Sequence, residues 1–176
     1  AQESASLQGA WKTEGPDGTI VMICSEKFFS ATVYEPASGT FKGTCGGTYK
    51  VNGGKFVEIH EFNTMKPELI GKETSTGLEI NRDLIVFNES SGKREWKRVD
   101  DGKPGALAGA WLITGRVNGE SMNKITPGAR RTMKILSGTR FQWIAYNVDT
   151  KEFLGTGGGT YTTENGKYVE TIDFFS

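Results

Sequence analysis

The feature that most constrains the fold of this chain is an internal repeat. The segment LQGAW at 7–11 recurs as LAGAW at 107–111, and residues 18–64 align with residues 130–176 at a constant shift of 112 without a gap. Sixteen of these 47 aligned positions are identical. Self-similarity of this kind predicts two copies of one structural unit.

The two copies differ in length. Residues 1–99 form the first copy, 100–106 a polar and turn-rich linker, and 107–176 the second copy, which carries twelve extra residues within 116–129. The second copy has no counterpart of residues 65–99, so strand edges and apolar faces would be left uncovered. We expect the chain to be a fragment of a longer protein. The alternative is that a partner, such as a second copy in a homodimer, supplies the missing strands.

The residue pattern predicts an all-β fold. Short stretches of alternating polarity are separated by turn clusters such as GPDG at 15–18 and NGG at 52–54. No segment carries the 3.6-residue stripe of a helix longer than two turns. Strands at about ten-residue spacing predict an antiparallel meander that closes into a β-barrel, in two tandem copies. The expected strands are 9–14, 19–24, 28–35, 40–50, 56–63, 69–74, 78–81, 84–88 and 93–99, then 111–114, 132–136, 141–147, 153–163 and 168–175.

Glycines lie inside one long predicted strand of each copy. The first copy has Gly43, Gly46 and Gly47, and the second has glycine at 155 and 157–159. Glycine within a strand weakens it unless the chain must bend, bulge or admit something close, and a sharply curved barrel strand meets that condition. A phosphate-binding loop is excluded because neither segment has GxGxxG spacing followed by a helix.

Composition and charge exclude several classes of partner. Lys and Arg total 21 and Asp and Glu total 21, so the basic footprint of a nucleic-acid-binding protein is absent. No run of 18 apolar residues would span a membrane. Since the sequence opens at Ala1 instead of Met, we expect a removed leader and a secreted, periplasmic or cell-envelope protein.

The two cysteines are predicted to be free thiols. One strand separates Cys24 from Cys45, which places their Cα atoms about 9.5 Å apart, beyond the reach of a disulfide. A cysteine nucleophile would need a paired histidine, and the chain has only His60. We therefore predict no catalytic cysteine.

The first and last strands of the first copy carry a known signature. Gly9-Ala10-Trp11 together with Arg98 resembles the lipocalin signature of the calycin superfamily, in which an arginine from the last strand covers the tryptophan of the first. Arg98 is the better candidate for this role and Arg94 is the alternative. The second copy repeats the first half of the signature at Gly109 and Trp111.

More closely, the chain is similar to a family of secreted bacterial lipocalin-like domains of unknown function. The resemblance is carried by the Leu-x-Gly-x-Trp opening, by GGTY at 46–49, by FVE at 56–58 and by the closing EWKR at 95–98, which lacks one spacer residue of the family pattern. The second copy follows the same order through YVE at 168–170. The resemblance implies a lipocalin-like barrel and export, and it implies no reaction.

Each copy presents one glutamate among aromatic residues. Strand alternation predicts that Phe56, Glu58, His60 and Phe62 share a face, and that their counterparts Tyr168, Glu170, Ile172 and Phe174 do so too. We expect a structural role for Glu58 and Glu170, as partners of Tyr49 and Tyr161 or of backbone amides. The alternative is that they project into the lumen and bind a cationic or hydroxylated ligand.

Two further aromatic faces are candidates for the lumen. Phe29 shares a face with Ala31 and Val33, and Phe141 shares one with Trp143 and Ala145. Such faces line the cavity of ligand-binding barrels, but a barrel of about 90 residues is small, and we expect these side chains to fill its core.

These patterns give a ranked set of functions. We expect no metal site, because Glu58 and His60 are too few ligands and Glu61 faces the other way, and we expect no cofactor. We expect a non-enzymatic module that binds a small apolar or amphipathic ligand. The alternative is a protein- or glycan-interaction module with a solid core, and an enzyme comes last because no catalytic constellation is present. A cavity beside Glu58 would favour the first function over the second.

Overall fold

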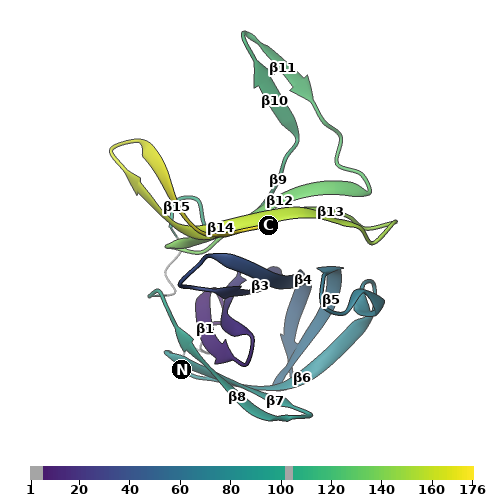
Figure 1. The fold of residues 1–176 in the computed structure, drawn as a ribbon, viewed down its shortest axis with the longest axis vertical. Coiled ribbons are helices and arrows are strands. Elements are labelled where there is room, and N and C mark those ends of the chain that lie inside the picture. The colour runs from purple at the N-terminus through teal and green to yellow at the C-terminus, as the bar shows by residue number, and fades with distance from the viewer. Residues whose placement is uncertain (1–5, 102–104) are drawn as a thin grey trace.

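A computed structural model describes residues 6–101 and 105–176 of the chain, so part of the expected linker, 102–104, lies outside the described residues. The fold is all-β, as predicted, and Figure 1 shows a barrel with a second sheet stacked on it. Within the described part, no helix is long and apolar enough to cross a bilayer. The strands are β1 (Gly9–Gly15), β2 (Gly18–Cys24), β3 (Phe28–Glu35), β4 (Thr40–Asn52), β5 (Lys55–Asn63), β6 (Glu73–Ile80), β7 (Leu84–Glu89), β8 (Gly92–Arg98), β9 (Gly109–Leu112), β10 (Gly115–Asn118), β11 (Ser121–Lys124), β12 (Arg130–Leu136), β13 (Arg140–Asn147), β14 (Phe153–Glu164) and β15 (Lys167–Phe175), with a short 3-10 helix at Pro67–Leu69.

The first eight strands form a closed antiparallel barrel. Each strand from β1 to β8 pairs with its neighbour in sequence, and β1 pairs with β8 through Trp11 opposite Arg98 and Lys12 opposite Lys97. The predicted meander barrel is therefore confirmed for this part of the chain. Closure leaves no free strand edge in the barrel, so all of its strands can hydrogen-bond on both sides.

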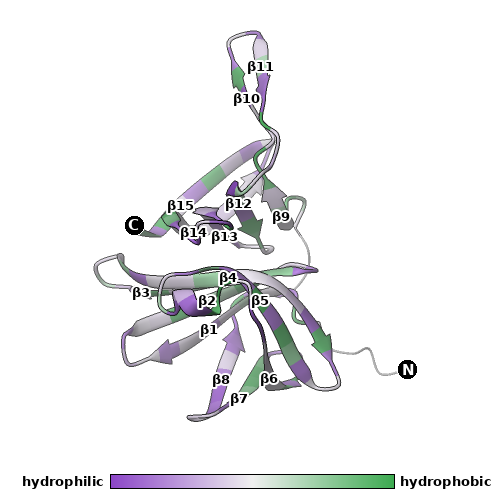
Figure 2. Cartoon of the chain, turned by 90° about the vertical axis from the view of Figure 1, so that its right-hand side faces the viewer, coloured by the Kyte–Doolittle hydropathy of each residue, from purple (hydrophilic) through white to green (hydrophobic). Residues whose placement is uncertain are grey.

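The second sheet is open. It contains β9 and β12–β15 in antiparallel order, and it meets the barrel sheet through a single parallel pair, Phe175 opposite Thr40. Its register repeats that of the barrel, because Phe29 pairs with Gly47 in the barrel and Phe141 pairs with Gly159 in the second sheet. The twelve-residue insertion contributes to a separate hairpin, β10–β11, which extends away from the body of the molecule (Figure 2).

A β-bulge interrupts the pairing of β4 with β5, and an equivalent bulge interrupts the pairing of β14 with β15. A Cβ atom on Gly47 would lie 2.0 Å from the carbonyl oxygen of Ile59, and one on Gly159 would lie 2.0 Å from that of Thr171. The glycines predicted to serve strand curvature thus allow two backbones to approach more closely than any other residue permits.

The bulge corrects the predicted face of two aromatic residues. Phe62 was expected beside His60, and Phe174 beside Ile172. Because the bulge adds one residue after His60, Phe62 turns to the outside of the barrel, where it packs with residues of the second sheet. Phe174 likewise contacts Val21 and Tyr34 of the barrel exterior. Strict alternation fails here because the side-chain period of two is broken wherever a strand bulges.

The barrel and the second sheet pack outer face against outer face with a local two-fold relation. Tyr34 contacts Phe174 at 5.1 Å between ring centroids, and Phe62 contacts Tyr146 at 5.0 Å, which is the same contact after exchange of the two copies. Phe41 stacks at 5.8 Å on Phe153, its own counterpart at the shift of 112. Contacts of this reciprocal kind define an isologous interface, here between two parts of one chain.

Polar groups fasten the same interface. The buried Gln142 side chain donates to Thr44 Oγ1 in the barrel and to Thr156 Oγ1 in its own sheet, both at 3.0 Å. Glu61 accepts hydrogen bonds from Arg131 at 3.0 Å and from the Tyr146 hydroxyl at 2.5 Å. Because buried polar groups are costly without partners, these satisfied contacts fix the second sheet in one orientation on the barrel.

The bulge glycines supply the first testable prediction. Gly47→Ala should lower the free energy of unfolding by at least about 3 kcal/mol, because the new methyl group would overlap the Ile59 carbonyl. Chemical unfolding in urea, followed by circular dichroism, measures the loss. Gly128→Ala is the matched control, since a Cβ there meets nothing within 4 Å. Equal stability of the two variants would contradict the assigned role of Gly47.

Candidate functional site

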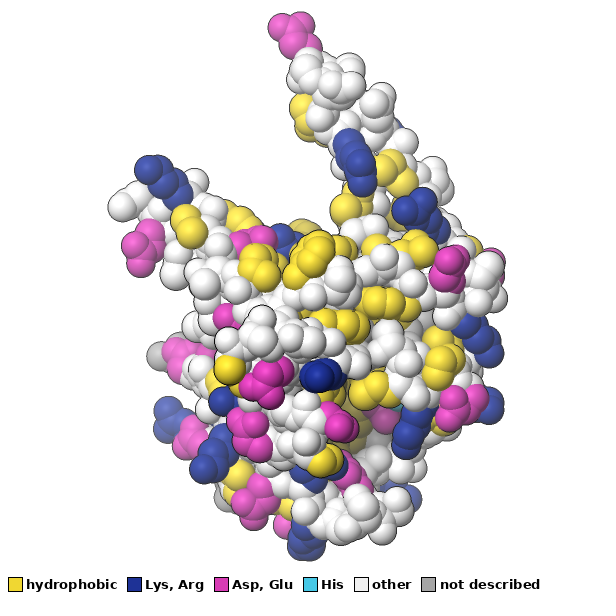
Figure 3. Space-filling view, viewed as in Figure 1, with side chains coloured by type: hydrophobic (Ala, Val, Ile, Leu, Met, Phe, Trp, Pro, Cys, Tyr) yellow, Lys and Arg dark blue, Asp and Glu magenta, His cyan; other side chains and the backbone are white. Residues whose placement is uncertain are grey.

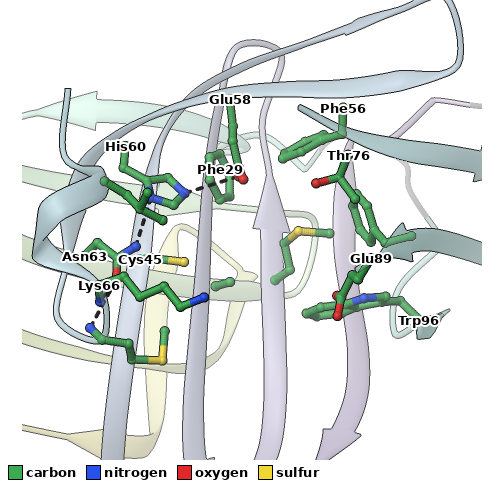
Figure 4. A pocket seen from close by; sticks show the side chains of 15 residues that line it. Phe29, Cys45, Phe56, Glu58, His60, Asn63, Lys66, Thr76, Glu89 and Trp96 are labelled. Atoms are coloured by element: carbon green, nitrogen blue, oxygen red, sulfur yellow. Dashed lines mark hydrogen bonds and ion pairs between the residues drawn. The ribbon is translucent and has the colours of Figure 1, made fainter. Parts of the chain in front are cut away.

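The lumen of the barrel contains a cavity of about 370 Å³. This corrects the expectation that the core side chains fill the barrel, although Phe29 and Ala31 do face the lumen as predicted. Space remains because Ala31 has a small side chain at the position where the second copy has Trp143. Figure 4 shows the cavity, which is lined by Met22, Phe29, Ala31, Cys45, Phe56, Glu58, His60, Asn63, Met65, Lys66, Leu69, Thr76, Phe87, Glu89 and Trp96.

The end of the barrel below the cavity is closed by Trp11 and Arg98. Trp11 is fully buried and its indole N–H donates to the Leu7 carbonyl at 2.8 Å, while the Arg98 guanidinium lies 4.0 Å from the ring centroid. Arg98 also donates to the carbonyls of Ser6 and Gln8. Of the two candidate arginines, Arg98 therefore occupies the capping position, and Arg94 instead pairs with Glu89 at 3.0 Å.

Aromatic rings form the wall of the cavity. Phe29 and Phe56 meet edge to face at 5.3 Å, and Phe56 meets Phe87 in the same way at 5.4 Å. Tyr49 stacks on Phe56, and its hydroxyl donates to the Ser25 carbonyl at 2.5 Å, so Tyr49 supports the wall without lining the cavity. Edge-to-face packing holds the rings in fixed orientations and gives the cavity a defined apolar surface.

Several polar side chains line the cavity, and the Glu58 carboxylate is the one that adjoins His60. Its Oε1 accepts a hydrogen bond from Thr74 at 3.1 Å, and its Oε2 lies 3.3 Å from His60 Nε2. The Glu58 side chain keeps 18% of its surface exposed, whereas that of His60 keeps only 7%. Both side chains line the cavity, and Glu58 is the more exposed of the two. The partners of Glu58 are Thr74 and His60 and not the Tyr49 hydroxyl considered from the sequence.

The orientation of His60 is set by Asn63. The Asn63 side-chain amide lies 2.9 Å from His60 Nδ1 and donates to it, which leaves the ring proton on Nε2, toward Glu58 (Figure 4). His60 Nε2 is buried and makes no hydrogen bond of good geometry, even with the nearby carboxylate. The Nε2 edge of the His60 ring thus faces the Glu58 carboxylate.

The mouth of the cavity is formed by residues that sequence reasoning missed. Met65, Lys66 and Leu69 come from the segment between β5 and β6, and Asn63 comes from the end of β5. This segment has no counterpart in the second copy, so the repeat comparison did not draw attention to it. The one sequence signal was Pro67, which begins the short 3-10 helix beside the opening.

Both cysteines are free thiols, as strand spacing predicts. Cys45 lines the cavity, and burial raises the pKa of its thiol to about 12. Burial also raises the pKa of Cys24. Since the thiolate is the nucleophilic form of cysteine, Cys45 stays protonated and unreactive at neutral pH.

The predicted residues of the second copy do not join this site. Glu170 contacts Lys134 and accepts a hydrogen bond from the Tyr168 hydroxyl at 2.6 Å, and the Tyr161 hydroxyl donates to the Ser137 carbonyl. With the half-buried Trp143, these side chains lie on the face of the second sheet that points away from the barrel. The ligand-binding residues predicted from the sequence therefore lie in two places: those of the first copy in or beside the barrel lumen, and those of the second copy on the second sheet.

The comparisons with known proteins give no family. No protein-family model matches the chain, and no curated protein matches it significantly. Over residues 6–101 and 105–176, no group of three or more His, Cys, Asp or Glu side chains could hold a metal ion.

The protonated state of Cys45 is open to a direct test. At pH 8 iodoacetamide should alkylate Cys45 of the native protein at least about a hundredfold more slowly than the urea-unfolded protein, because the thiolate fraction falls tenfold for each unit by which pKa exceeds pH. Peptide mass spectrometry distinguishes Cys45 from Cys24. Alkylation of native Cys45 at the unfolded rate would contradict the assigned burial of this thiol.

Proposed function

We propose that the closed barrel is a lipocalin-like, non-enzymatic module that binds a small apolar or amphipathic molecule in its lumen. The observation that carries this proposal is the cavity of about 370 Å³ beside Glu58, which is near the lower end of the size range of ligand pockets. Trp11, Arg98 and the closing pair of β1 with β8 support the lipocalin-like assignment. The resemblance to secreted domains supports a secreted or cell-envelope location.

The lining of the cavity supports a proposal for the chemistry of the ligand. Its wall is made of phenylalanine rings, which favour an alkyl or aromatic body. Its polar lining includes the Glu58 carboxylate, which accepts hydrogen bonds and attracts positive charge, together with Lys66 and Glu89. We therefore assign to the lumen a molecule with an apolar body and one amine or hydroxyl group directed at Glu58.

A binding role is preferred to catalysis because of the state of the reactive groups. Cys45 is the cysteine that lines the cavity, and the raised pKa of its thiol keeps it protonated. The Nδ1 atom of His60 is occupied by Asn63, and its Nε2 faces Glu58. Neither group is poised to activate the other.

The alternative function, a protein- or glycan-interaction module, gains support from one part of the molecule only. Exposed aromatic side chains at Tyr34, Tyr146 or Trp143 would favour this alternative. Tyr34 and Tyr146 are buried in the interface between barrel and second sheet, and Trp143 is half-buried on the second sheet. Trp111 and Tyr168 of the second sheet are exposed. Any interaction surface is therefore expected on that sheet, and the barrel retains the lumen for a small molecule.

Filling the lumen tests the proposal. The fluorescent apolar amine N-phenyl-1-naphthylamine should bind the protein with one-to-one stoichiometry, and Ala31→Trp should weaken binding at least about tenfold, because an indole would occupy the cavity. Tryptophan is the residue that the second copy has at this position. Fluorescence titration measures the affinity, and urea unfolding verifies that the variant is folded.

Ile172→Ser is the control for binding outside the lumen, since Ile172 is exposed on the second sheet. This variant should bind the probe as the parent protein does. Loss of binding in Ile172→Ser with full binding in Ala31→Trp would place the probe on the second sheet and refute the proposal.

The role of Glu58 is tested by the headgroup of the ligand. Glu58→Gln should weaken the binding of dodecylamine about tenfold or more, because a charge-assisted hydrogen bond of about 1.5–3 kcal/mol is lost. Binding of dodecanol should change much less. Displacement of the fluorescent probe measures both affinities, and an equal effect on the two ligands would contradict an orienting role of Glu58.

A further inference from the structure

We propose that the second sheet is a receptor for a three-stranded antiparallel β segment that carries an arginine in its last strand, and that this segment closes the sheet into a second barrel. The segment that fills this role in the first barrel is Glu73–Arg98, which forms β6, β7 and β8. This inference is independent of the ligand proposed for the lumen. It concerns the face of β9 and β12–β15 that points away from the barrel, called the open face below.

The open face exposes the side chains that the first copy buries. In Figure 3 hydrophobic side chains gather in the hollow between the β14–β15 hairpin and the β10–β11 hairpin. Four equivalent positions show the difference in exposed fraction: Trp11 0% and Trp111 54%, Phe56 3% and Tyr168 39%, His60 6% and Ile172 50%, Asn63 5% and Phe175 63%. An apolar surface of this kind on a folded protein marks a place of contact.

The backbone edges of the open face are also available. In the barrel, β5 pairs with β6 from Lys55 to Ile59, and β1 pairs with β8 at Trp11 and Lys12. The corresponding residues are 167–171 of β15 and 111–112 of β9. They pair with β14 and with β12 on one side, and among the described residues no strand pairs with them on the other side. Two such edges flanking one apolar face are arranged to accept added strands by backbone hydrogen bonding.

The Trp111 ring is already held in the orientation in which Trp11 meets Arg98 in the barrel. The Trp111 indole N–H donates to the Leu107 carbonyl at 3.0 Å, as Trp11 does to Leu7 at 2.8 Å, and Gly9 and Gly109 share a positive φ of 121° and 142°. Within the described part of the chain, no cation lies over the Trp111 ring. A segment that closes this sheet must therefore bring the guanidinium that Arg98 provides in the barrel.

The charges of the open face restrict the rest of the segment. Lys134 pairs with Glu170, and its amine lies 5.0 Å from the ring centroids of Phe141 and Tyr168. The pair carries no net charge, so the surface opposite it should be apolar with a polar group able to reach Glu170. Apart from its arginine, the complementary segment is therefore expected to present an apolar face without unpaired charge.

A folded second copy of this chain is a poorer occupant. Its own β6, β7 and β8 are paired on both sides in the closed barrel, so they cannot be offered to another molecule. Its protruding hairpin provides only β10 and β11, each of four residues. Neither β6–β8 nor the β10–β11 hairpin of a second copy can therefore supply three free strands with an arginine that reaches the Trp111 ring.

A graft tests the proposal. Residues 65–99 are repeated after Ser176, so that the copied segment follows the residue equivalent to Thr64. Hydrogen exchange measured by mass spectrometry should show backbone amides of β9 and β15 exchanging at least about a hundredfold more slowly than in the unextended chain. A graft of the same composition in scrambled order should give no protection. Arg98→Ala made in the graft alone should restore exchange at β9.

Two results would overturn the inference. The first is a graft that leaves β9 and β15 exchanging as before while β1–β8 remain protected, including in a version joined through a longer Gly-Ser linker. The second is an unextended chain that is dimeric by light scattering and already protects β9 and β15, since a second copy would then cover the open face. If the chain is a monomer and iodide quenches the fluorescence of Trp111, the open face is accessible to solvent, as proposed. The Trp111 signal is assigned by its loss in Trp111→Phe.

Discussion

The β-bulge at Gly46 and Gly47 is the constraint on which both surfaces of the barrel depend. It shifts the pairing of β5 by one residue, so that Glu58 and His60 point into the lumen while Phe62 points out. Without the extra residue, Phe62 would enter the lumen and fill the cavity. The same bulge exposes Glu61 to Arg131 and Tyr146 at the interface. One backbone irregularity thus makes room for a ligand and supplies an anchor for the second sheet.

The outer-face interface accounts for three aromatic identities of the repeat. Tyr34, Phe41 and Phe62 are identical to their counterparts at the shift of 112, and each contacts the other copy in a reciprocal way. In the lumen, Phe29 and Glu58 are also identical to their counterparts, but other positions have diverged: Ala31 corresponds to Trp143 and His60 to Ile172. The two copies therefore retain a shared docking face while their inner faces differ in size and polarity. Ligands of the two inner faces are expected to differ accordingly.

This arrangement also explains why the second sheet is open without being disordered. Packing of its outer face on the barrel buries Met133, Ile135 and Ile144, which supplies the apolar contact that an isolated five-stranded sheet lacks. The barrel acts as a support on one side, and the face with Trp111 remains accessible on the other. A closed lumen and an open β surface thus coexist in a single chain.

Much of the fold followed from the sequence because it depends on local patterns. Alternation of polar and apolar residues predicted the strands, turn residues predicted the hairpins, and strand order placed Cys24 and Cys45 too far apart to bond. The candidate site was predicted less completely. Phe29, Phe56, Glu58 and His60 do line the cavity, but Asn63 and Lys66 were missed because they reach it from a connecting segment without periodicity.

The sequence by itself determined the repeat and the β pattern, because both depend on residue type and spacing along the chain, while the pairing of Trp11 with an arginine of the last strand was implied by the resemblance to the lipocalin signature. Tertiary structure alone decided that the lumen retains a cavity, that Phe62 faces outward and that the second sheet docks by its outer face. The physical reason is that cavities, bulges and reciprocal packing depend on contacts between segments that are far apart in the sequence. The spacing of residues within one strand does not determine how closely such segments approach each other.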